Sequence, residues 1–514
     1  MVIRLIDTKS GGFVLFEREE EIPPYAILSH TWVHGEEISF KEMQEISNDP
    51  NHPARERSGF RKIANTCYQA RGHMLDFAWI DTCCIDKKDP TELGEAINSM
   101  FKWYQQAAIC YVYLEDYSEM GSLGGCRWFS RGWCLQELIA PNRIIFYDRH
   151  WERVGDKLML EDYLSDITNV DKDILRGEQS LDTVPIARRM SWAAKRNTAR
   201  IEDQAYCLLG IFDIHMPLLY GEGANAFIRF QEEIIKRSED LSIFAPAADV
   251  IDSQDVPAQP CNLLATSPKE FANFGQLTPT RGLDLTAQPF TMTNFGLNFL
   301  QQELGVFVSW EEPIYTLSLQ CELGPNQKLY LRLQQIAPSR FILVRGSRGL
   351  TQTTDSPQEF WSTGSIYISA KFTPGIKSLI DISSKRIIRF TIGGGTKIGF
   401  TPADDESRLQ WDHSRKAFFL TSRITYVSVK FDIPGKINNY ICCCINRSNK
   451  YVRFWTSGVW GSAERDSRSE RDERRRAKYG NKHADEIRLN STMAKVKLRE
   501  EEYGYSVALR FDDE

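Results

Sequence analysis

Four short apolar runs in the first 150 residues, each ending in polar residues, constrain the fold of this 514-residue chain more than any other feature. They are "YAILSH" (25–30), "FAWIDTCCID" (77–86), "ICYVYLED" (109–116) and "RIIFYD" (143–148). Runs of this kind are typical of strands buried on both faces, as in parallel sheets. The pattern predicts that the first part of the chain is an α/β domain.

A helical segment separates the second run from the third. Asp89 is suited to be its N-cap, Pro90 its first residue and Glu92 its capping-box partner. Apolar residues follow at spacings of three and four, which predicts one buried helical face. Alternating strands and helices predict an open parallel sheet with helices on both faces. Ligands of such sheets bind outside the carboxyl ends of the strands.

The pattern changes further along the chain. Residues 151–243 carry amphipathic helical segments, and residues 244–260, rich in Ala, Pro and Asp, are interpreted as a linker. Residues 261–461 hold short runs of alternating polarity, which predict an antiparallel β-sandwich domain. Residues 462–493 include a mixed-charge run and are interpreted as a charged insertion or disordered segment. Residues 494–514 are predicted to form a terminal β-hairpin.

Composition excludes several classes of protein. No apolar run is long enough to span a membrane, and a net charge of −6 gives no general basis for specific nucleic-acid binding. The N-terminal stretch is broken by charges and a Ser-Gly-Gly turn, which predicts a hairpin and not a signal peptide. The twelve cysteines are therefore expected to be reduced and the protein to be cytoplasmic. His30 and His34 lack a third ligand nearby, so no metal site is expected.

Longer motifs of the first half closely resemble the HET (heterokaryon-incompatibility) domain of filamentous fungi. They are "YAILSHTW", "WIDTCCIDK", "ELGEAINSMFKWYQQAAICYVYLED", "WFSRGWCLQELIAP", "RMSWAAKRNTARIEDQAYCLLGIF" and "MPLLYGEGANAFIRFQEEI". The resemblance assigns residues 1–243 to a HET domain, with a TIR-like α/β core in 1–150 and a helical part in 151–243. It implies a role in non-self recognition and regulated fungal cell death. HET domains are also regarded as distant relatives of TIR domains.

The stretch "WCLQEL" (133–138) resembles a helix of plant-type TIR domains whose glutamate is catalytic in NAD⁺ cleavage. The resemblance places Glu137 on that glutamate, with NAD⁺ as substrate and no separate cofactor. Such a reaction also needs an aromatic face for a ring, donors for phosphate, and polar groups that orient the ribose. The candidates for these substrate-binding roles are Trp32 and Trp133, Arg127 and Arg131, and Ser29, His30 and Asp81.

Each candidate also has a structural interpretation. Trp133 can be a core residue, Arg127 can pair with Glu119 or Asp116 on the surface, and Glu137 itself can be structural. The alternative function is a non-catalytic signalling scaffold that triggers cell death by oligomerisation and partner recruitment. Homo-oligomerisation is expected under both hypotheses, and a protein trigger would act through the β-sandwich domain. A third hypothesis is a hydrolase whose nucleophile is Ser29, Cys83 or Cys84, although the sequence shows no histidine partner for them.

Overall fold

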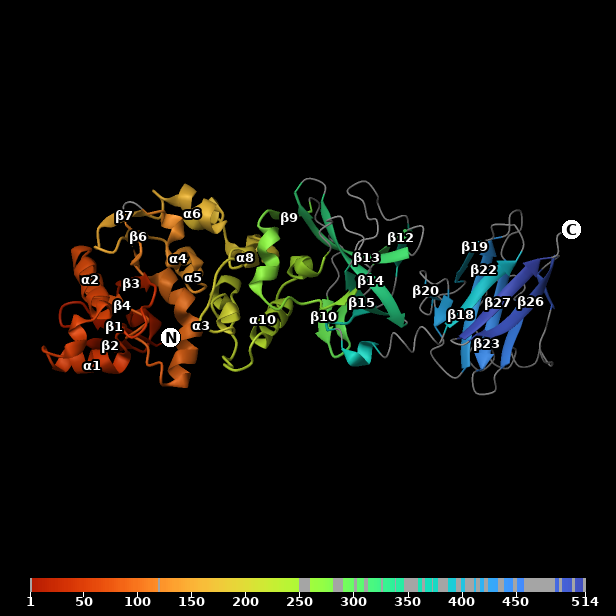
Figure 1. The fold of residues 1–514 in the computed structure, drawn as a ribbon, viewed down its shortest axis with the longest axis horizontal. Helices are drawn as coiled ribbons and strands as arrows, with labels where there is room; N and C mark the ends of the chain where they lie inside the picture. The colour runs from red at the N-terminus through yellow and green to blue at the C-terminus, as the bar shows by residue number, and fades with distance from the viewer. Residues whose placement is uncertain are drawn as a thin grey trace. The chain divides into compact units, whose positions relative to one another are not determined.

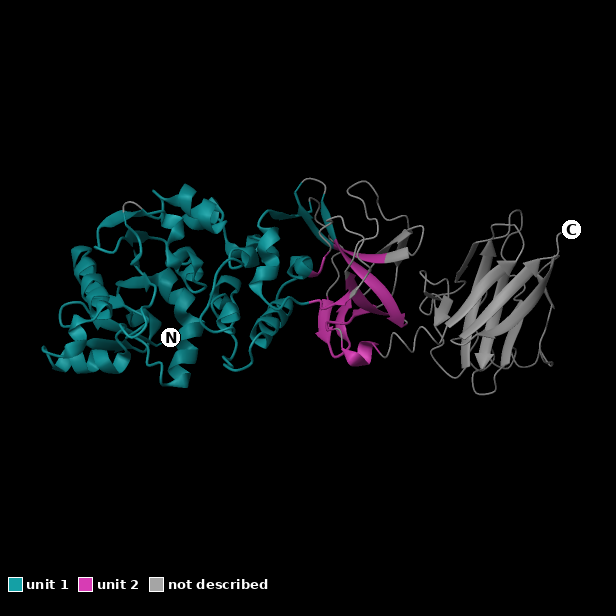
Figure 2. Cartoon of the chain, in the orientation of Figure 1, with its two compact units in different colours: residues 1–246, 264–282, 319–329 teal, residues 247–263, 283–318, 330–514 magenta. Residues whose placement is uncertain are grey.

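A computed structural model of the chain divides it into two compact units (Figure 2). Unit 1 consists of residues 1–246, 264–282 and 319–329, and unit 2 of residues 247–263, 283–318 and 330–514. The residues that the structure describes are 2–118, 121–248, 259–280, 290–299, 303–308, 313–324, 327–337, 339–345, 359–362, 366–371, 373–377, 387–393, 399–402, 411–412, 417–419, 424–432, 439–446, 451–456, 486–489, 492–501 and 504–511.

Unit 1 is built on a seven-stranded sheet of order β2-β1-β4-β3-β5-β6-β7 (Figure 1). The four central strands are parallel, whereas β1, β2 and β7 pair in antiparallel fashion at the edges. The α/β prediction and the N-terminal hairpin are confirmed, with a mixed sheet in place of a wholly parallel one. The strands are β1 (Ile3–Asp7), β2 (Phe13–Phe16), β3 (Tyr25–His30), β4 (Phe77–Trp79), β5 (Ile109–Tyr113), β6 (Ile144–Tyr147) and β7 (Arg153–Asp156).

Helices pack against this sheet and form the remainder of unit 1. Helix α2 contacts β3 and β4, whereas α5 contacts β3 and α3. In Figure 1, α1 and α2 lie on one side of the central strands and α3 with α5 on the other. The helices are α1 (Phe40–Asn48), α2 (Ser58–Gly72), α3 (Pro90–Gln106), α4 (Arg127–Ser130), α5 (Cys134–Ile139), α6 (Glu161–Thr168), α7 (Lys172–Arg176), α8 (Ile186–Ser191), α9 (Asp203–Tyr206) and α10 (Asn225–Ile235).

The N-terminus of α3 is fixed by both a local cap and long-range contacts. Asp89 caps the helix as predicted, because its carboxylate accepts from the amides of Thr91 and Glu92. Glu92 does not complete a capping box. Its carboxylate instead accepts from the guanidinium of Arg4 and from the amide of Asp86. The ion pair with Arg4 thus takes the place of the capping-box hydrogen bond expected of Glu92.

Strand β3 is the point at which the direction of winding reverses. The chain passes from β3 through α1 and α2 to β4 on one side, and then through α3 to β5 on the other side of β3. Loops that leave neighbouring strands in opposite directions open a crevice at the carboxyl ends of the strands. The polar residues at the ends of β3 and β4 therefore come to the same edge.

The C-terminal part of the chain is rich in antiparallel β-structure, as predicted. A ten-stranded sheet contains β8 to β17, and two further sheets of six and four strands contain β18 to β27. Parallel pairing occurs between β15 and β17 and between β18 and β27. The strands are β8 (Gln259–Cys261), β9 (Leu277–Pro279), β10 (Phe290–Thr293), β11 (Gly296–Phe299), β12 (Glu303–Val308), β13 (Pro313–Leu323), β14 (Lys328–Ala337), β15 (Arg340–Arg345), β16 (Glu359–Ser362), β17 (Ile366–Ile368), β18 (Ile387–Gly393), β19 (Gly399–Pro402), β20 (Trp411–Asp412), β21 (Ala417–Phe419), β22 (Ile424–Asp432), β23 (Asn439–Asn446), β24 (Tyr451–Thr456), β25 (Glu486–Leu489), β26 (Thr492–Glu501) and β27 (Gly504–Phe511).

Two segments show how the units differ from the boundaries predicted from sequence. The 3₁₀ helix η6 (Leu241–Ala247) runs into the stretch interpreted as a linker, and Phe244 in it is fully buried. Residues 264–282 belong to unit 1, where η7 (Pro268–Phe274) packs against α8. Strands β26 and β27, which fall mostly within the predicted terminal hairpin, pair in antiparallel fashion. The mixed-charge run at 464–478 lies outside the described residues.

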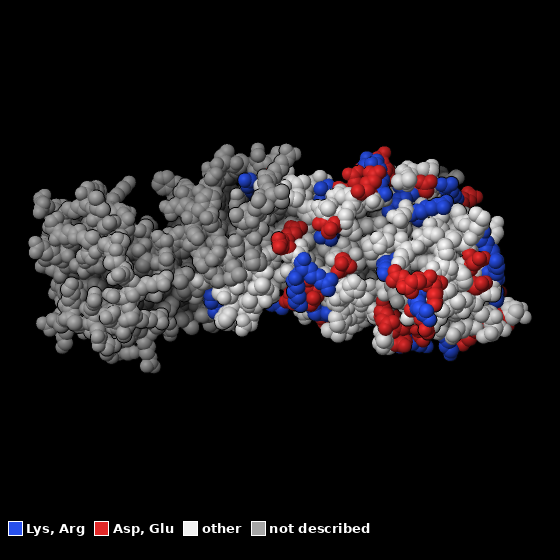
Figure 3. All heavy atoms as spheres, turned by 180° about the vertical axis from the view of Figure 1, so that it is seen from behind, with Lys and Arg blue, Asp and Glu red and all other residues white. Residues whose placement is uncertain are grey.

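Acidic and basic side chains are intermixed on the face of the described surface shown in Figure 3. Among the described residues, no helix is both long and apolar enough to cross a membrane. Eight buried cysteines are free thiols: Cys67, Cys83, Cys84, Cys110, Cys126, Cys134, Cys207 and Cys321.

Candidate active site

Glu137 lies on α5, a short helix buried along its whole length at the carboxyl edge of the parallel strands. Its apolar neighbours hold it inside the domain, and the helix ends just before Pro141, as the sequence predicts. Glu137 is only 5% exposed. Its carboxylate accepts a short hydrogen bond from Ser29 Oγ at the end of β3. Ser29 Oγ in turn accepts from Trp128 Nε1 at 2.7 Å.

The environment of Glu137 adjusts its proton affinity. Burial raises the pKa of the Glu137 carboxyl to about 7, while the charge of Arg131 and the hydrogen bond from Ser29 oppose this rise. A carboxyl group with a pKa near neutrality can both take up and release a proton under physiological conditions. Glu137 is therefore equipped for acid–base work or for stabilising positive charge.

Asp81, which follows β4, forms the second polar centre of this edge. Its oxygens lie 3.1 Å from His30 Nε2 and 3.1 Å from Trp32 Nε1. Burial alone would raise the pKa of Asp81, but Lys87 and the contact with His30 hold it well below the usual range. Asp81 is thus ionised, and it fixes the orientation of both rings.

Two cations lie against the Trp32 ring. Lys87 Nζ is 3.7 Å from the ring centroid and Arg131 Cζ is 4.9 Å from it. Lys87 Nζ is also 3.9 Å from an Asp81 oxygen. The pKa of Lys87 is lowered, chiefly by burial, with Asp81 opposing the effect and Arg131 adding to it. Trp32 itself is 41% exposed, so this layer borders the solvent.

A buried ion pair between Lys62 and Glu37 lies next to His30. Lys62 on α2 donates to Glu37 Oε1 at 2.6 Å and to the carbonyl of Thr31 at 3.0 Å. The other oxygen of Glu37 lies 3.9 Å from His30 Nδ1. The sequence analysis missed Lys62, Glu37 and Lys87. Lys62 is one polar residue among the buried positions of a helix, and no local pattern indicates its partner.

The structure brings together six of the eight predicted site residues: Ser29, His30, Trp32, Asp81, Arg131 and Glu137. The other two have different partners. The Arg127 guanidinium pairs with Glu115 at 3.0 Å and with Asp116 at 3.5 Å. Trp133 hydrogen-bonds to Asp203, and this contact opposes the effect of burial, which raises the pKa of Asp203.

The geometry gives little support to a thiol or serine nucleophile. Burial, together with neighbouring Cys84, raises the pKa of the Cys83 thiol well above its usual value, which disfavours the reactive thiolate. The Ser29 hydroxyl contacts the Glu137 carboxylate and the Trp128 indole. Neither arrangement is the nucleophile–histidine pair that such hydrolases use.

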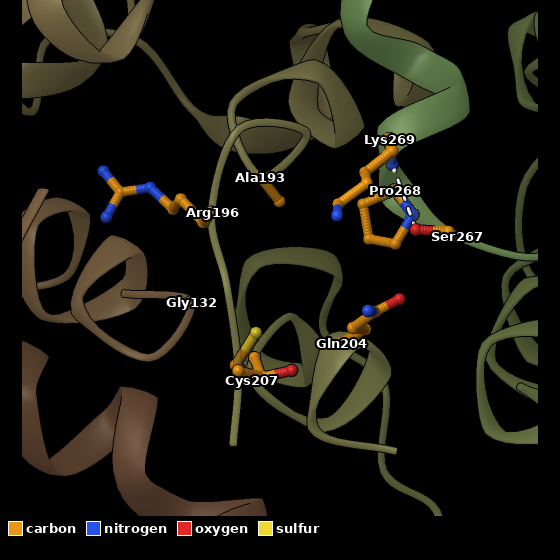
Figure 4. A pocket seen from close by; sticks show the side chains of 9 residues that line it. Gly132, Ala193, Arg196, Gln204, Cys207, Ser267, Pro268 and Lys269 are labelled. Atoms are coloured by element: carbon orange, nitrogen blue, oxygen red, sulfur yellow. Dashed lines mark hydrogen bonds between the residues drawn. The ribbon is translucent and has the colours of Figure 1, made fainter. Parts of the chain in front are cut away.

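Two hollows in unit 1 do not include Glu137 in their lining. A cavity of about 10 Å³ is lined by Gly132, Ala193, Arg196, Thr198, Gln204, Cys207, Ser267, Pro268 and Lys269. Figure 4 shows the Arg196 side chain extending away from Ser267, Pro268 and Lys269. A groove of about 900 Å³ runs along α3 beside residues 215–218. In the described part of the chain, no cluster of three or more His, Cys, Asp or Glu side chains could hold a metal ion.

Comparison with known proteins identifies the family of this region. Residues 25–127 match the family described as heterokaryon incompatibility protein (HET). Vegetative incompatibility protein HET-E-1 of Podospora anserina is 44% identical over 266 residues, which are 48% of this chain and 19% of that protein. The chain thus spans about a fifth of the length of this relative. No solved structure matches the present chain. The match to the family includes Ser29, His30, Trp32, Asp81 and Lys87 and ends at Arg127, before Glu137. This region of the chain therefore matches the HET family.

Proposed function

We propose that this protein acts in heterokaryon incompatibility and that its HET domain hydrolyses the bond between nicotinamide and ribose in NAD⁺. The first part of the proposal is supported by the HET family match and by the similarity to a vegetative incompatibility protein. The second part is carried by one observation. Glu137 is a buried carboxylate with a pKa of about 7, held by Ser29 at the carboxyl edge of the parallel strands.

The proposed reaction converts NAD⁺ and water into ADP-ribose, nicotinamide and a proton. Breaking the bond leaves positive charge on the ribose, while nicotinamide departs as a neutral molecule. The Glu137 carboxylate would stabilise that charge and accept the proton of the attacking water. Ser29 would hold Glu137 in place, and Trp32 would supply an aromatic face.

The low exposure of Glu137 bears on how such an activity is controlled. At 5% exposure the carboxylate is closed to a dinucleotide, so side chains at the crevice must move before the substrate enters. Self-association of the HET domain, in response to a protein that contacts the β-rich region, would supply this rearrangement. The domain would then be inactive as a monomer and active as an oligomer.

The test is nicotinamide release from NAD⁺ by the purified full-length protein at high concentration. Glu137→Gln retains the size of the side chain and removes its charge, so release is expected to fall at least a hundredfold, the order of magnitude of losing a catalytic proton transfer. Glu115→Gln is the matched control, because Glu115 pairs with Arg127 outside the site. Equal release by the wild type and Glu137→Gln would refute the proposed role of Glu137.

The alternative is that the domain is a non-catalytic scaffold. It is favoured by the same burial, because the Trp128–Ser29–Glu137 hydrogen bonds tie α4, β3 and α5 together as a structural network would. Under this hypothesis oligomeric wild-type protein releases no nicotinamide. Incompatibility in cells would then survive the Glu137→Gln substitution.

A further inference from the structure

We infer that Lys87 and Arg131 form a binding site for the diphosphate group of a dinucleotide, in which both cations leave the Trp32 ring to meet the phosphates. This inference rests on the proposed function and deepens it, because it names the part of the substrate that the crevice recognises. It also assigns a role to Lys87. The two residues are called the cation pair below.

The hydrogen-bond donors of the cation pair are not in use. Lys87 Nζ is 3.9 Å from its partner Asp81, which is beyond hydrogen-bond distance, and its side chain is 33% exposed. Within the described residues, neither the Lys87 ammonium nor the Arg131 guanidinium makes a hydrogen bond. An ammonium carries three N–H donors and a guanidinium five. The pair therefore presents two charges and unused donors at the border of the solvent.

Asp81 explains why the N–H donors of Lys87 and Arg131 make no hydrogen bond. Its two oxygens are already hydrogen-bonded by His30 and Trp32, so Asp81 orients the indole ring and leaves the cations to rest on it. A cation held by an aromatic face is held weakly compared with one that is hydrogen-bonded to a phosphate oxygen. An arriving diphosphate can therefore draw both cations away at little cost.

Two properties match the pair to a diphosphate. Both cations lie within 5 Å of one ring centroid, so a group that carries two adjacent negative charges can meet both. Their departure also uncovers the Trp32 ring, on which the nicotinamide or adenine ring of the same molecule can stack. Phosphate binding and ring binding thereby become one event.

The other arginines around the crevice are already engaged. Arg127 is paired with Glu115 and Asp116. Arg196 donates to the backbone carbonyls of Arg131 and Trp192, and although its Nη2 has no partner, the side chain is only 6% exposed and does not border the solvent. Lys87 and Arg131 differ from these two arginines, because their charged groups border the exposed Trp32 ring and make no hydrogen bond within the described residues.

The experiment is isothermal titration calorimetry on the full-length protein with three probes: inorganic pyrophosphate, ADP-ribose and nicotinamide riboside, which lacks phosphate. Lys87→Met and Arg131→Met each remove one charge and retain an unbranched, apolar side chain. Lys88→Met is the matched control, because Lys88 is exposed and adjacent to Lys87 but has no contact with Trp32. Thermal unfolding establishes that each variant is folded.

Each variant of the cation pair is expected to weaken the binding of pyrophosphate and ADP-ribose by about tenfold to a hundredfold, the size of one charge-assisted hydrogen bond. Lys88→Met should bind both as the wild type does, and nicotinamide riboside should be insensitive to Lys87→Met. No binding of pyrophosphate, or equal binding by all folded variants, would overturn the inference. Pyrophosphate binding that depends on the pair, without any cleavage of NAD⁺, would uphold the inference and refute the proposed reaction.

Discussion

The raised pKa of Glu137 predicts that the Glu137→Gln variant gains stability relative to the wild type as the pH rises from 4.5 to 8. Its pKa is about 7 in the folded protein, compared with 4.5 for an ordinary glutamate exposed to solvent. Between these values the folded state retains a proton that the unfolded state has lost. The contribution of Glu137 to the free energy of unfolding is thus fully present below about pH 4.5. It is lost as pH rises through 7.

The magnitude follows from the size of the shift. One pKa unit corresponds to about 1.4 kcal/mol, so the wild type should lose about 3 kcal/mol through this group between pH 4.5 and pH 8. Glu137→Gln is neutral at every pH and escapes this loss. Relative to the wild type, the variant should therefore gain about 3 kcal/mol over that interval, with most of the gain between pH 5 and 7.

Hydrogen–deuterium exchange of peptides that cover α5 measures the opening of this part of the chain alone, which matters because the chain has two compact units. Wild type and variant are compared at each pH, so the intrinsic exchange chemistry and the titrations that both share cancel. A difference that stays constant from pH 5 to pH 8 would refute the reasoning, because the carboxylate would then titrate alike in the folded and unfolded states.

Two further predictions concern stability. Lys62→Met should lower the free energy of unfolding by about 3 kcal/mol or more, because Glu37 is left as an unpaired charge in a buried site, and adding Glu37→Gln should recover most of the loss in a denaturant titration. A loss below 1 kcal/mol for Lys62→Met would contradict a buried ion pair. Gly94→Ala within α3 should raise stability by up to about 1 kcal/mol, because the new methyl group meets no atom within 4 Å. Gly210→Ala should lower stability by at least 1 kcal/mol, because its Cβ would lie 2.0 Å from Phe101 Cβ, and equal melting temperatures for these two variants would show that the packing argument fails.

Sequence patterns predicted the framework of the site because that framework follows from local rules. Buried runs that end in polar residues placed Ser29, His30 and Asp81 at the carboxyl ends of parallel strands, and the sheet register brings these ends together. Glu137 was identified by the resemblance of its helix to a known motif. Its burial could not be identified in this way, since an isolated glutamate in a sequence is more often exposed.

The sequence could not predict which basic residues contact the Trp32 ring. Arg127 and Arg131 are close along the chain and chemically alike. The structure nevertheless directs Arg127 to the acids of the preceding loop and Arg131 to the Trp32 ring. Lys87 and Lys88 are adjacent, and Lys87 is the one that contacts this ring. The partner of each basic residue depends on which side chains from distant segments of the chain pack next to it.

The sequence by itself determined the class of the fold, the order of its strands and helices in the chain, and the positions of the polar residues at the ends of the strands. These properties follow from periodicity, capping and turn chemistry, which act between near neighbours. The tertiary structure alone decided which carboxylates are buried, which are ionised, and which cations lie beside them. Burial and charge are summed over every segment that packs around a group, and in this domain Ser29 and Glu137, which are in contact, lie 108 residues apart in the chain.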